Sequence, residues 1–395
     1  MNIQVAIPSL SPAQRVLPVG VSKNPDVIQR GPIDSWLLLA VVVLLFIGEI
    51  MVFSTSYFYG FERFNDPYRF FWKHQLALVI GALGLFAAVS CNSATYHRLA
   101  YPLLAVAIVG LAIVFLPGIS HGRVHRWIHI GPLNFQPSEL AKGAVVFYLA
   151  ASLARKTAQL KSFLYGIMPH LLVVGTVVLL IALEPDLGGA VTVCLLLFAM
   201  LFAVGARLRH LALLTICGGV FIVCATLAAD YRLDRIISFI HADDHAQGGS
   251  YQLKQSLIAF GAGGIKGVGL GEGRQKMFYL PEAHTDFIFA VVGEETGLWG
   301  TGAIVFLFGM LGIRGVRIAL RHPQLFGRLL AFGCTMLLVL QAGLNLAVVL
   351  GLLPTKGLPL PFISYGGSSL VMMLIYAGIL LSLSRESRKD NRVYA

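Results

Sequence analysis

The stretch SWLLLAVVVLLFIGEIMVFST, residues 35–55, decides the fold class. It runs for 21 residues with a single ionisable side chain, Glu49. A helix needs about 20 mainly apolar residues to cross the hydrocarbon core of a bilayer, so this stretch predicts a transmembrane helix. The apolar run begins near Trp36, which is too late and too long for the apolar core of a secretory signal.

The same composition extends along the chain. Hydrophobic residues make up 57% of the 395 residues and charged residues 12%, whereas soluble domains average about a quarter charged residues. Ten candidate spans follow, at residues 35–55, 72–89, 99–117, 138–153, 164–183, 188–205, 211–229, 286–312, 326–350 and 367–383. The sequence therefore predicts an all-α integral membrane protein, a polytopic bundle of about ten transmembrane helices.

The loop charges predict how this bundle is oriented. One set of short loops holds ten lysines and arginines and the opposite set holds five. By the positive-inside rule, both termini are expected in the cytoplasm. We expect cytoplasmic tails at 1–33 and 386–395, a membrane domain at 34–385, and a large extracytoplasmic loop at 230–285. The net charge of +11 then reflects basic cytoplasmic loops facing anionic lipid and not nucleic acid.

The sequence YLPEAHTDFIFAVVGEE, from Tyr279, places four polar residues at the outer end of the eighth span. They are Glu282, His284, Thr285 and Asp286. Ionisable residues at a span boundary are candidates for function. Helix capping by Thr285 or Asp286 is the alternative, because acidic groups favour helix N-termini. Glu294 lies about 12 Å deeper at 1.5 Å per residue, and there it needs a partner or a wet cavity.

The outer loop RWIHIGPLNFQPSELAK begins with Arg126 at the membrane interface and ends with Lys142 inside an apolar run. A cation at that depth needs a counter-charge, and Glu139 or a carboxylate on another helix can supply it. His121, His125 and His129 are spaced by four, which on a helix is a zinc-binding spacing. The neighbouring glycines and Pro132 favour a loop instead, so the metal remains unassigned.

The segment GLLPTKGLPLPFISYGGSS, residues 351–369, contains too many prolines and glycines for a continuous helix. Non-helical backbone at membrane depth must be buried in protein or line a cavity. Lys356 there suits a phosphate, or it snorkels to the interface. The acidic turn Glu184-Pro185-Asp186 is either part of the same face or a simple loop. Charges and aromatic residues around an apolar bundle suit a substrate with a lipid tail and a polar head.

The motifs LPEAHTDFIFAVVGEE, RWI with QPSELAK, EPDLG, YQLKQS and GLLPTKGLPLPFISYGGSS together resemble the SEDS family (shape, elongation, division and sporulation). The similarity covers about residues 34–385, and PEAHTD and PTKG are closer to the division members than to the elongation members. The resemblance implies a ten-span peptidoglycan glycosyltransferase that polymerises lipid II at the division septum, in the bacterial inner membrane. Glu49 departs from the usual apolar residue of the family.

The resemblance also implies the site and its partners. Asp286 corresponds to the essential aspartate of the family and is expected to be the general base. We expect substrate-binding residues at Lys356, Arg126, Lys142, Glu282, His284, Thr285, Ser364 and Gln252. A divalent cation, Mg²⁺ or Mn²⁺, is an expected cofactor. The implied partners are a class B penicillin-binding transpeptidase and other division proteins. A lipid II transporter and a non-catalytic division scaffold are the alternatives.

Overall fold

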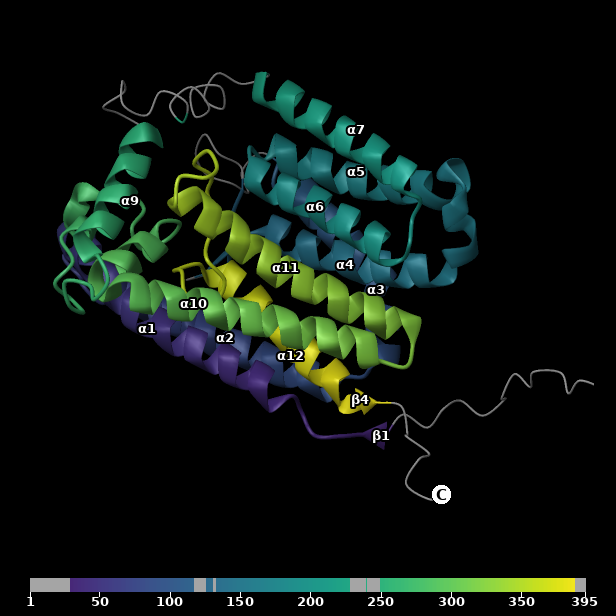
Figure 1. Cartoon of the computed structure of the whole chain (residues 1–395), viewed down its shortest axis with the longest axis horizontal. Coiled ribbons are helices and arrows are strands. Elements are labelled where there is room, and N and C mark those ends of the chain that lie inside the picture. Colours follow the sequence, from purple (N-terminus) through teal and green to yellow (C-terminus); the bar gives the residue numbers. More distant parts are fainter. Residues whose placement is uncertain (1–28, 117–125, 131–132, 228–238, 240–248, 388–395) are drawn as a thin grey trace, which may run out of the picture.

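The computed structural model describes residues 29–116, 126–130, 133–227, 239 and 249–387 (Figure 1). The long stretch at 35–55 forms the first helix, α1, which begins after Asp34 because the Asp34 carboxylate accepts a hydrogen bond from the Leu37 amide. The helices are α1 (Ser35–Phe64), α2 (Arg69–Ser90), α3 (Ser93–Ile113), α4 (Pro137–Arg155), α5 (Met168–Leu183), α6 (Leu187–Ala203), α7 (Leu208–Leu227), α9 (Gly249–Gly263), α10 (Ile288–Arg321), α11 (Leu325–Val349) and α12 (Gly367–Arg385). Short turns of other helical types are η1 (Thr157–Lys161), η2 (Phe163–Ile167) and η3 (Gln275–Tyr279).

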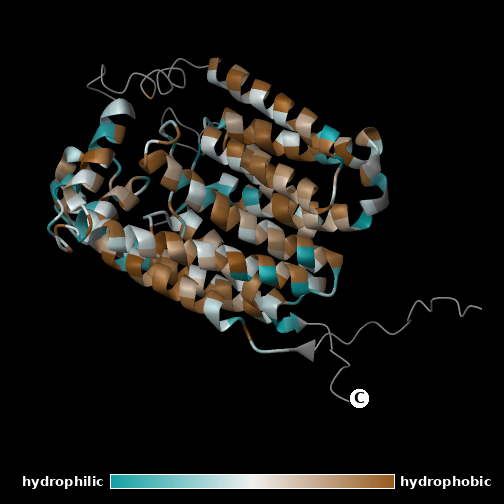
Figure 2. Ribbon diagram, in the orientation of Figure 1, coloured by the Kyte–Doolittle hydropathy of each residue, from teal (hydrophilic) through white to brown (hydrophobic). Residues whose placement is uncertain are grey.

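Each of the ten candidate spans corresponds to one of these helices, with α9 additional to them. Seven helices are long and apolar enough to cross a membrane, and α6 and the Leu208–Phe221 part of α7 are shorter apolar segments. The tenth, α4, carries the charged pair Glu139 and Lys142. Apolar residues dominate these helices (Figure 2). The prediction of an all-α, multi-pass membrane protein is confirmed.

Helix α12 packs against α2 at close range, because glycines face the contact. A Cβ atom at Gly378 would lie 2.6 Å from the Leu85 carbonyl oxygen, and one at Gly81 would lie 2.5 Å from the Leu374 side chain. Small residues let helix backbones approach within a membrane, where packing rather than the hydrophobic effect drives association. Helix α12 is the most buried of the seven long spans found among the described residues.

The rare charges inside the bundle are paired locally. The Lys142 ammonium, 1% exposed, lies 2.8 Å from the Glu139 carboxylate and 2.9 Å from the Gln341 amide oxygen. The Tyr376 hydroxyl donates to the Glu139 carbonyl across to α12. A buried charge is tolerated when it is paired and hydrogen-bonded. The predicted pairing of Lys142 with Glu139 is confirmed, and it ties α4 to α11.

The glycine-rich segment before α10 is held by two neighbouring acids. Glu294 accepts hydrogen bonds from the backbone amides of Arg274 and Gln275, which supplies the partners that a carboxylate at this depth needs. Glu295 lies 2.6 Å from the Lys276 ammonium. Helix α9 lies within the predicted large loop, whereas residues 230–238 and 240–248 of that loop lie outside the described residues.

Both described ends of the chain meet at one face. Strand β1 (Gln29–Arg30) pairs antiparallel with β4 (Glu386–Ser387), and Asp34 forms an ion pair with Arg314 at 2.6 Å. This agrees with an even number of spans. Most of the two predicted tails lies outside the described residues.

Strands β2 (Ile128–Ile130) and β3 (Leu133–Phe135) pair antiparallel before α4. His129 is therefore on a strand and not on a zinc-binding helix.

The contact between α2 and α12 leads to a stability prediction. Gly378→Ala places a methyl group against the Leu85 backbone, which cannot move aside as a side chain can, so overpacking of about 1–3 kcal/mol is expected. The thermal unfolding midpoint of the detergent-purified protein should fall. Gly175→Ala on α5 is the matched control, because a Cβ there has no atom within 4 Å. Equal midpoints for the two variants would contradict this packing.

Candidate functional site

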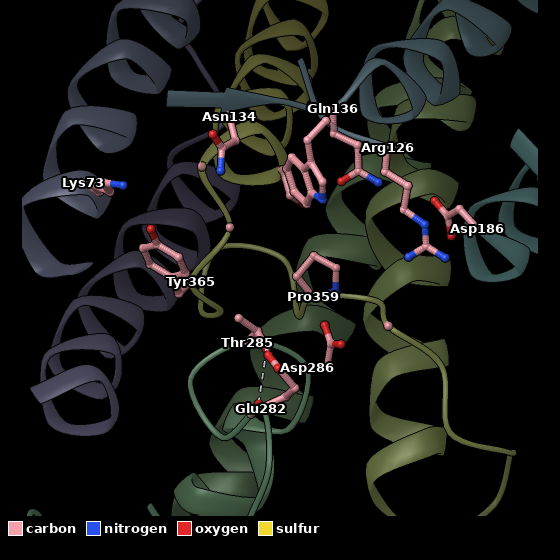
Figure 3. Close-up of a pocket in the computed structure, with 15 residues that line it drawn as sticks. Lys73, Arg126, Asn134, Gln136, Asp186, Glu282, Thr285, Asp286, Pro359 and Tyr365 are labelled. Atoms are coloured by element: carbon pink, nitrogen blue, oxygen red, sulfur yellow. Dashed lines mark hydrogen bonds between the residues drawn. The ribbon is translucent and has the colours of Figure 1, made fainter. Parts of the chain in front are cut away.

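Two cavities adjoin each other at Asp286, at the opposite end of α10 from the paired terminal strands. Their volumes are about 300 and 630 Å³. Five residues line both cavities: Arg126, Asp186, Glu282, Asp286 and Gly357. The smaller cavity is also lined by polar side chains such as Lys73, Asn134 and Gln136, and Figure 3 shows its lining side chains converging from several elements. The larger cavity has an apolar wall from α6 and α11. Side chains from distant parts of the sequence therefore form one site.

The turn that carries Asp286 is pinned by a side chain of α11. The Asn345 amide donates to the Asp286 carbonyl at 2.8 Å and to the Leu358 carbonyl at 2.6 Å. Helix α10 takes Phe287 as its N-cap residue and has no side-chain cap hydrogen bond. Neither Thr285 nor Asp286 is therefore the N-cap residue of α10. The Asp286 carboxylate instead lines both cavities, partly exposed.

Glu282 and Thr285 form the outer edge of this turn. Glu282 adopts a positive φ of 56°, a conformation that non-glycine residues reach at a cost. Its carboxylate accepts a hydrogen bond from the Thr285 hydroxyl at 2.8 Å (Figure 3). Glu282 lines both cavities and Thr285 the smaller one. The hydrogen bond keeps the exposed Glu282 side chain beside the cavities.

The acidic turn between α5 and α6 belongs to the site and is not a simple connector. The Arg126 guanidinium donates to the Glu184 carbonyl at 2.7 Å and to the Pro185 carbonyl. Asp186 caps α6 through the Gly189 amide at 2.8 Å and lines both cavities. Glu184 is fully buried. Burial, reinforced by the Asp186 charge and opposed by Arg126, raises the pKa of Glu184 to about 8.

Lys356 and Gln252 line the larger cavity. Burial lowers the pKa of Lys356, because a low-dielectric environment disfavours the charged form. Gly357 follows, and a Cβ there would lie 3.1 Å from an Asp286 carboxylate oxygen. The missing side chain at Gly357 leaves room beside the carboxylate at the junction of the two cavities.

Three of the predicted substrate-binding residues lie behind the cavity walls. Lys142 is held by Glu139 and Gln341 as described. His284 is packed among aromatic rings that include Tyr59, Phe70 and Tyr365. The Ser364 hydroxyl accepts a hydrogen bond from the Leu360 amide at 2.8 Å. None of the three lines the two cavities. Lys142 instead joins α4 to α11, and His284 and Ser364 contact neighbouring loop segments.

Burial lowers the pKa of the His284 imidazole, with the Glu282 charge acting in the opposite direction. The His284 carbonyl accepts a hydrogen bond from the Tyr365 amide at 3.0 Å. His284 therefore joins the Asp286 turn to the 351–366 segment.

The described residues do not form a complete protein site for the divalent cation expected from the sequence. Among the described residues, no group of three His, Cys, Asp or Glu side chains could hold a metal ion. His121 and His125 lie outside the described residues. Carboxylates of Asp186, Glu282 and Asp286 do line the cavities, and carboxylate oxygens are the ligands that Mg²⁺ prefers. One or two of them together with substrate phosphates suit Mg²⁺, which rarely uses an all-protein site.

The structure also reveals site residues that the sequence reading missed. Lys73, Trp127, Asn134, Gln136 and Tyr365 line the smaller cavity. Lys73 is the second residue of the predicted span 72–89. An ionisable residue inside a predicted span is a candidate for function, so its position in the sequence could have identified it. Asp186 was noted only as part of an acidic turn. Asn345 gave no sequence signal beyond being an amide in an apolar run.

Proteins of known description resemble this chain over nearly its whole length. A protein named "Probable peptidoglycan glycosyltransferase FtsW" from Geobacter sulfurreducens (strain DL-1 / KN400) is 42% identical over 353 residues, covering 89% of this chain and 95% of that protein. "Stage V sporulation protein E" from Bacillus subtilis (strain 168) is 40% identical over 358 residues, covering 90% and 98%.

Solved structures give the same result for the fold. One, described as "Structural coordination of polymerization and crosslinking by a peptidoglycan synthase complex", superposes with a TM-score of 0.75 at 29% identity, covering 91% of this chain and 99% of that one. The rod shape determining protein RodA of Thermus thermophilus gives 0.67 at 29% identity, covering 91% and 98%. The family described as "Cell cycle protein" (FtsW, RodA, SpoVE) matches residues 35–389. The match to the family over residues 35–389 and the identity to these relatives show that the chain belongs to the FtsW/RodA/SpoVE family of cell cycle proteins.

Proposed function

We infer that this chain is a peptidoglycan glycosyltransferase that polymerises lipid II into glycan strands during septal cell-wall synthesis. The observation that carries the inference is the position of the Asp286 carboxylate at the junction of two cavities. A polymerase must bring two substrates together at one reacting centre. Relatives of the chain that bear the name peptidoglycan glycosyltransferase support the same reaction.

Asp286 acts as the general base. Its carboxylate takes the proton from the 4-hydroxyl of the acceptor sugar, and the hydroxyl oxygen forms a bond to the anomeric carbon of the donor sugar. The bond between that carbon and the donor's diphosphate oxygen breaks, and undecaprenyl diphosphate leaves. A base positioned in this way contributes about 10²–10⁴ in rate.

Positive charge at the cavities supports departure of the diphosphate. Lys356 lines the larger cavity, and Arg126 lines both. A cation beside a developing anion stabilises it most in a water-poor site. The raised pKa of Glu184 leaves that carboxyl neutral near pH 7, so it adds no negative charge beside Arg126. The carboxylates of Asp186, Glu282 and Asp286 would hold a divalent cation, which would supply Lewis-acid stabilisation of the leaving diphosphate.

The substrate is amphiphilic, and the larger cavity matches that character. Leu187, Val191 and Leu195 of α6 face Leu344 and Leu353 across it. Lys356 and Gln252 lie at the same cavity. A hydrocarbon chain packs on the apolar wall while phosphate and sugar groups lie beside the polar residues.

The placement of the protein follows from the same chemistry. We propose that it lies in the bacterial inner membrane at the division septum, with both termini cytoplasmic and the cavities on the outer side, where the basic loops place them. Its partners are a class B penicillin-binding transpeptidase and other division proteins, and nucleic acid is not a partner. The description of one structural neighbour, which couples polymerization with crosslinking in a complex, supports the transpeptidase.

Transport of lipid II is the weaker alternative. A transporter needs a polar route near mid-membrane. The candidates for that route are Glu49, Lys142 and Glu294, and each has local partners: Glu49 lies 3.1 Å from His74, and the other two are satisfied as described above. A purely structural scaffold would not need Asp286 at a cavity junction.

Asp286→Asn should abolish polymerisation of purified lipid II while the protein still folds and binds its transpeptidase partner. The amide keeps the shape of the carboxylate but cannot take a proton, so a loss of at least about 100-fold is expected. Glycan products resolved by gel electrophoresis measure the rate, and the thermal unfolding midpoint reports folding.

Glu272→Gln is the matched control, since Glu272 is an exposed acid that lines neither cavity. This variant should polymerise at the wild-type rate. Full activity of Asp286→Asn would exclude Asp286 as the base. Intact cell division in cells that carry Asp286→Asn, with the variant still recruited to the division site, would favour the scaffold instead.

Glu184 should make stability depend on pH. A carboxyl with a pKa near 4.5 when unfolded and about 8 when folded binds a proton only in the folded state across that window. Stability therefore falls as pH rises from about 4.5 to about 8 and levels off above it. Glu184→Gln removes this titration, so its unfolding midpoint should fall less than that of the wild type between pH 5 and pH 8. Parallel pH curves for the two proteins would contradict a buried, neutral Glu184.

A further inference from the structure

Lys73 is a cation on the wall of the smaller cavity that the mechanism above does not use. It lies one turn into α2 and is partly buried. Figure 3 shows its ammonium end directed toward the space between Asn134 and Tyr365. No hydrogen bond or ion pair joins this ammonium to another described side chain. Three acids, Asp186, Glu282 and Asp286, line the same cavity, and none of these described residues is hydrogen-bonded or ion-paired to Lys73. An ammonium that faces a cavity in this way can receive an anionic ligand.

Two other cations near the site, Arg126 and Lys142, have hydrogen-bond partners within the protein. Arg126 already donates to the carbonyl oxygens of Glu184 and Pro185, and Lys142 is buried with Glu139. Lys356 lines only the larger cavity, and Lys73 lines only the smaller one. Each cavity thus has its own lysine with no side-chain partner within the described part of the chain.

An apolar groove continues from the smaller cavity toward the membrane interior. It has a volume of about 180 Å³ and is lined by Ile80 of α2, Phe135 of β3, and Val371 and Met372 of α12. Asn134 and Gly367 line both the groove and the smaller cavity, so the two spaces adjoin. Hydrocarbon is the ligand that such a surface binds.

The spacing along α2 places the cation above the groove. Ile80 follows Lys73 by seven residues, which is two helical turns on the same face and about 10 Å deeper. Trp72 beside Lys73 is 67% exposed, as interfacial tryptophans are. Lys73 therefore lies at the depth where lipid phosphates lie, with an apolar path directly below it.

We propose that Lys73 binds the diphosphate of a polyprenyl-linked substrate whose chain runs down the groove between α2 and α12. This rests on the proposed function, which requires a second lipid-linked sugar. Lys356 and the apolar wall of the larger cavity provide the same head-and-tail arrangement for the first. The two sugars then meet at the wall shared by both cavities, which contains Asp286.

Binding stoichiometry tests the proposal without relying on activity. Native mass spectrometry of the full chain carrying Asp286→Asn counts bound geranylgeranyl diphosphate, a short polyprenyl diphosphate. Two molecules are expected per chain, and Lys73→Met should reduce this to one. Lys266→Met is the matched control, since Lys266 is an exposed lysine outside both cavities, and it should retain two. Two bound molecules in the Lys73→Met chain would overturn the proposal.

A competition experiment distinguishes binding of a lipid diphosphate at Lys73 from binding of free inorganic diphosphate. Inorganic diphosphate at tenfold excess should not displace the Lys73-dependent molecule, because it lacks the chain that packs in the groove. Displacement at equal concentration would overturn the assignment to a lipid. Ile80→Trp fills the groove from the membrane side, where Ile80 is 37% exposed, and should weaken geranylgeranyl diphosphate binding at this position alone.

Kinetics give the second readout. Lys73→Met should slow polymerisation at subsaturating lipid II by about 10- to 100-fold, the range expected when a charge-assisted hydrogen bond is lost. Lys73→Arg should stay within about threefold of the wild type, because it keeps the charge. Full activity of Lys73→Met beside an inactive Asp286→Asn would overturn only the role of Lys73. Activity of Asp286→Asn itself would overturn the proposed function instead.

Discussion

The Asn345 side chain holds the site together. Its amide nitrogen lies within hydrogen-bond distance of the Asp286 carbonyl and the Leu358 carbonyl, so one residue of α11 fixes two segments that are over seventy positions apart in the chain. Asn345 is 2% exposed, and buried polar groups that lose their partners cost about 1–3 kcal/mol. The bonds therefore lock the Asp286 turn against the 351–366 segment. Asp286 and Gly357, one from each of these two segments, line both cavities, so the Asn345 hydrogen bonds hold the junction between the cavities in place.

Behind that junction, two lysines buried in the bundle are each paired with a nearby glutamate. Lys142 with Glu139, and Lys276 with Glu295, are within 2.8 and 2.6 Å. Because a buried ion pair adds little net stability compared with apolar packing, these pairs are better explained by the geometry they impose. The first joins α4 to α11 through Gln341, and the second holds the glycine-rich segment on α10. Both brace the elements that carry the cavity walls.

The sequence was sufficient for the spans and for the polar cluster that contains Asp286, because both leave local signals. Twenty apolar residues are visible in a row, and four polar residues in five positions at a span end are visible as a cluster. The close approach of α12 to α2 was not predictable, since Gly81 and Gly378 are 297 positions apart and only the fold brings them together. The role of Asp186 was not predictable for the same reason. Its turn is part of the site because Arg126, 60 positions away in the sequence, donates hydrogen bonds to the Glu184 and Pro185 carbonyls of that turn.

Lys142 and Lys73 show why residue type alone does not assign a role. Both are lysines within apolar segments, and the sequence singled out Lys142 because it is deeper. In the structure, Lys142 is 1% exposed and contacts Glu139 and Gln341. The Glu139 carboxylate therefore neutralises its charge inside the protein. Lys73 faces a cavity without a described partner. A cation whose charge is already balanced shapes the fold, whereas a cation that faces a cavity unbalanced attracts a ligand. The depth of a charge in the membrane therefore says less about function than whether the protein itself neutralises that charge.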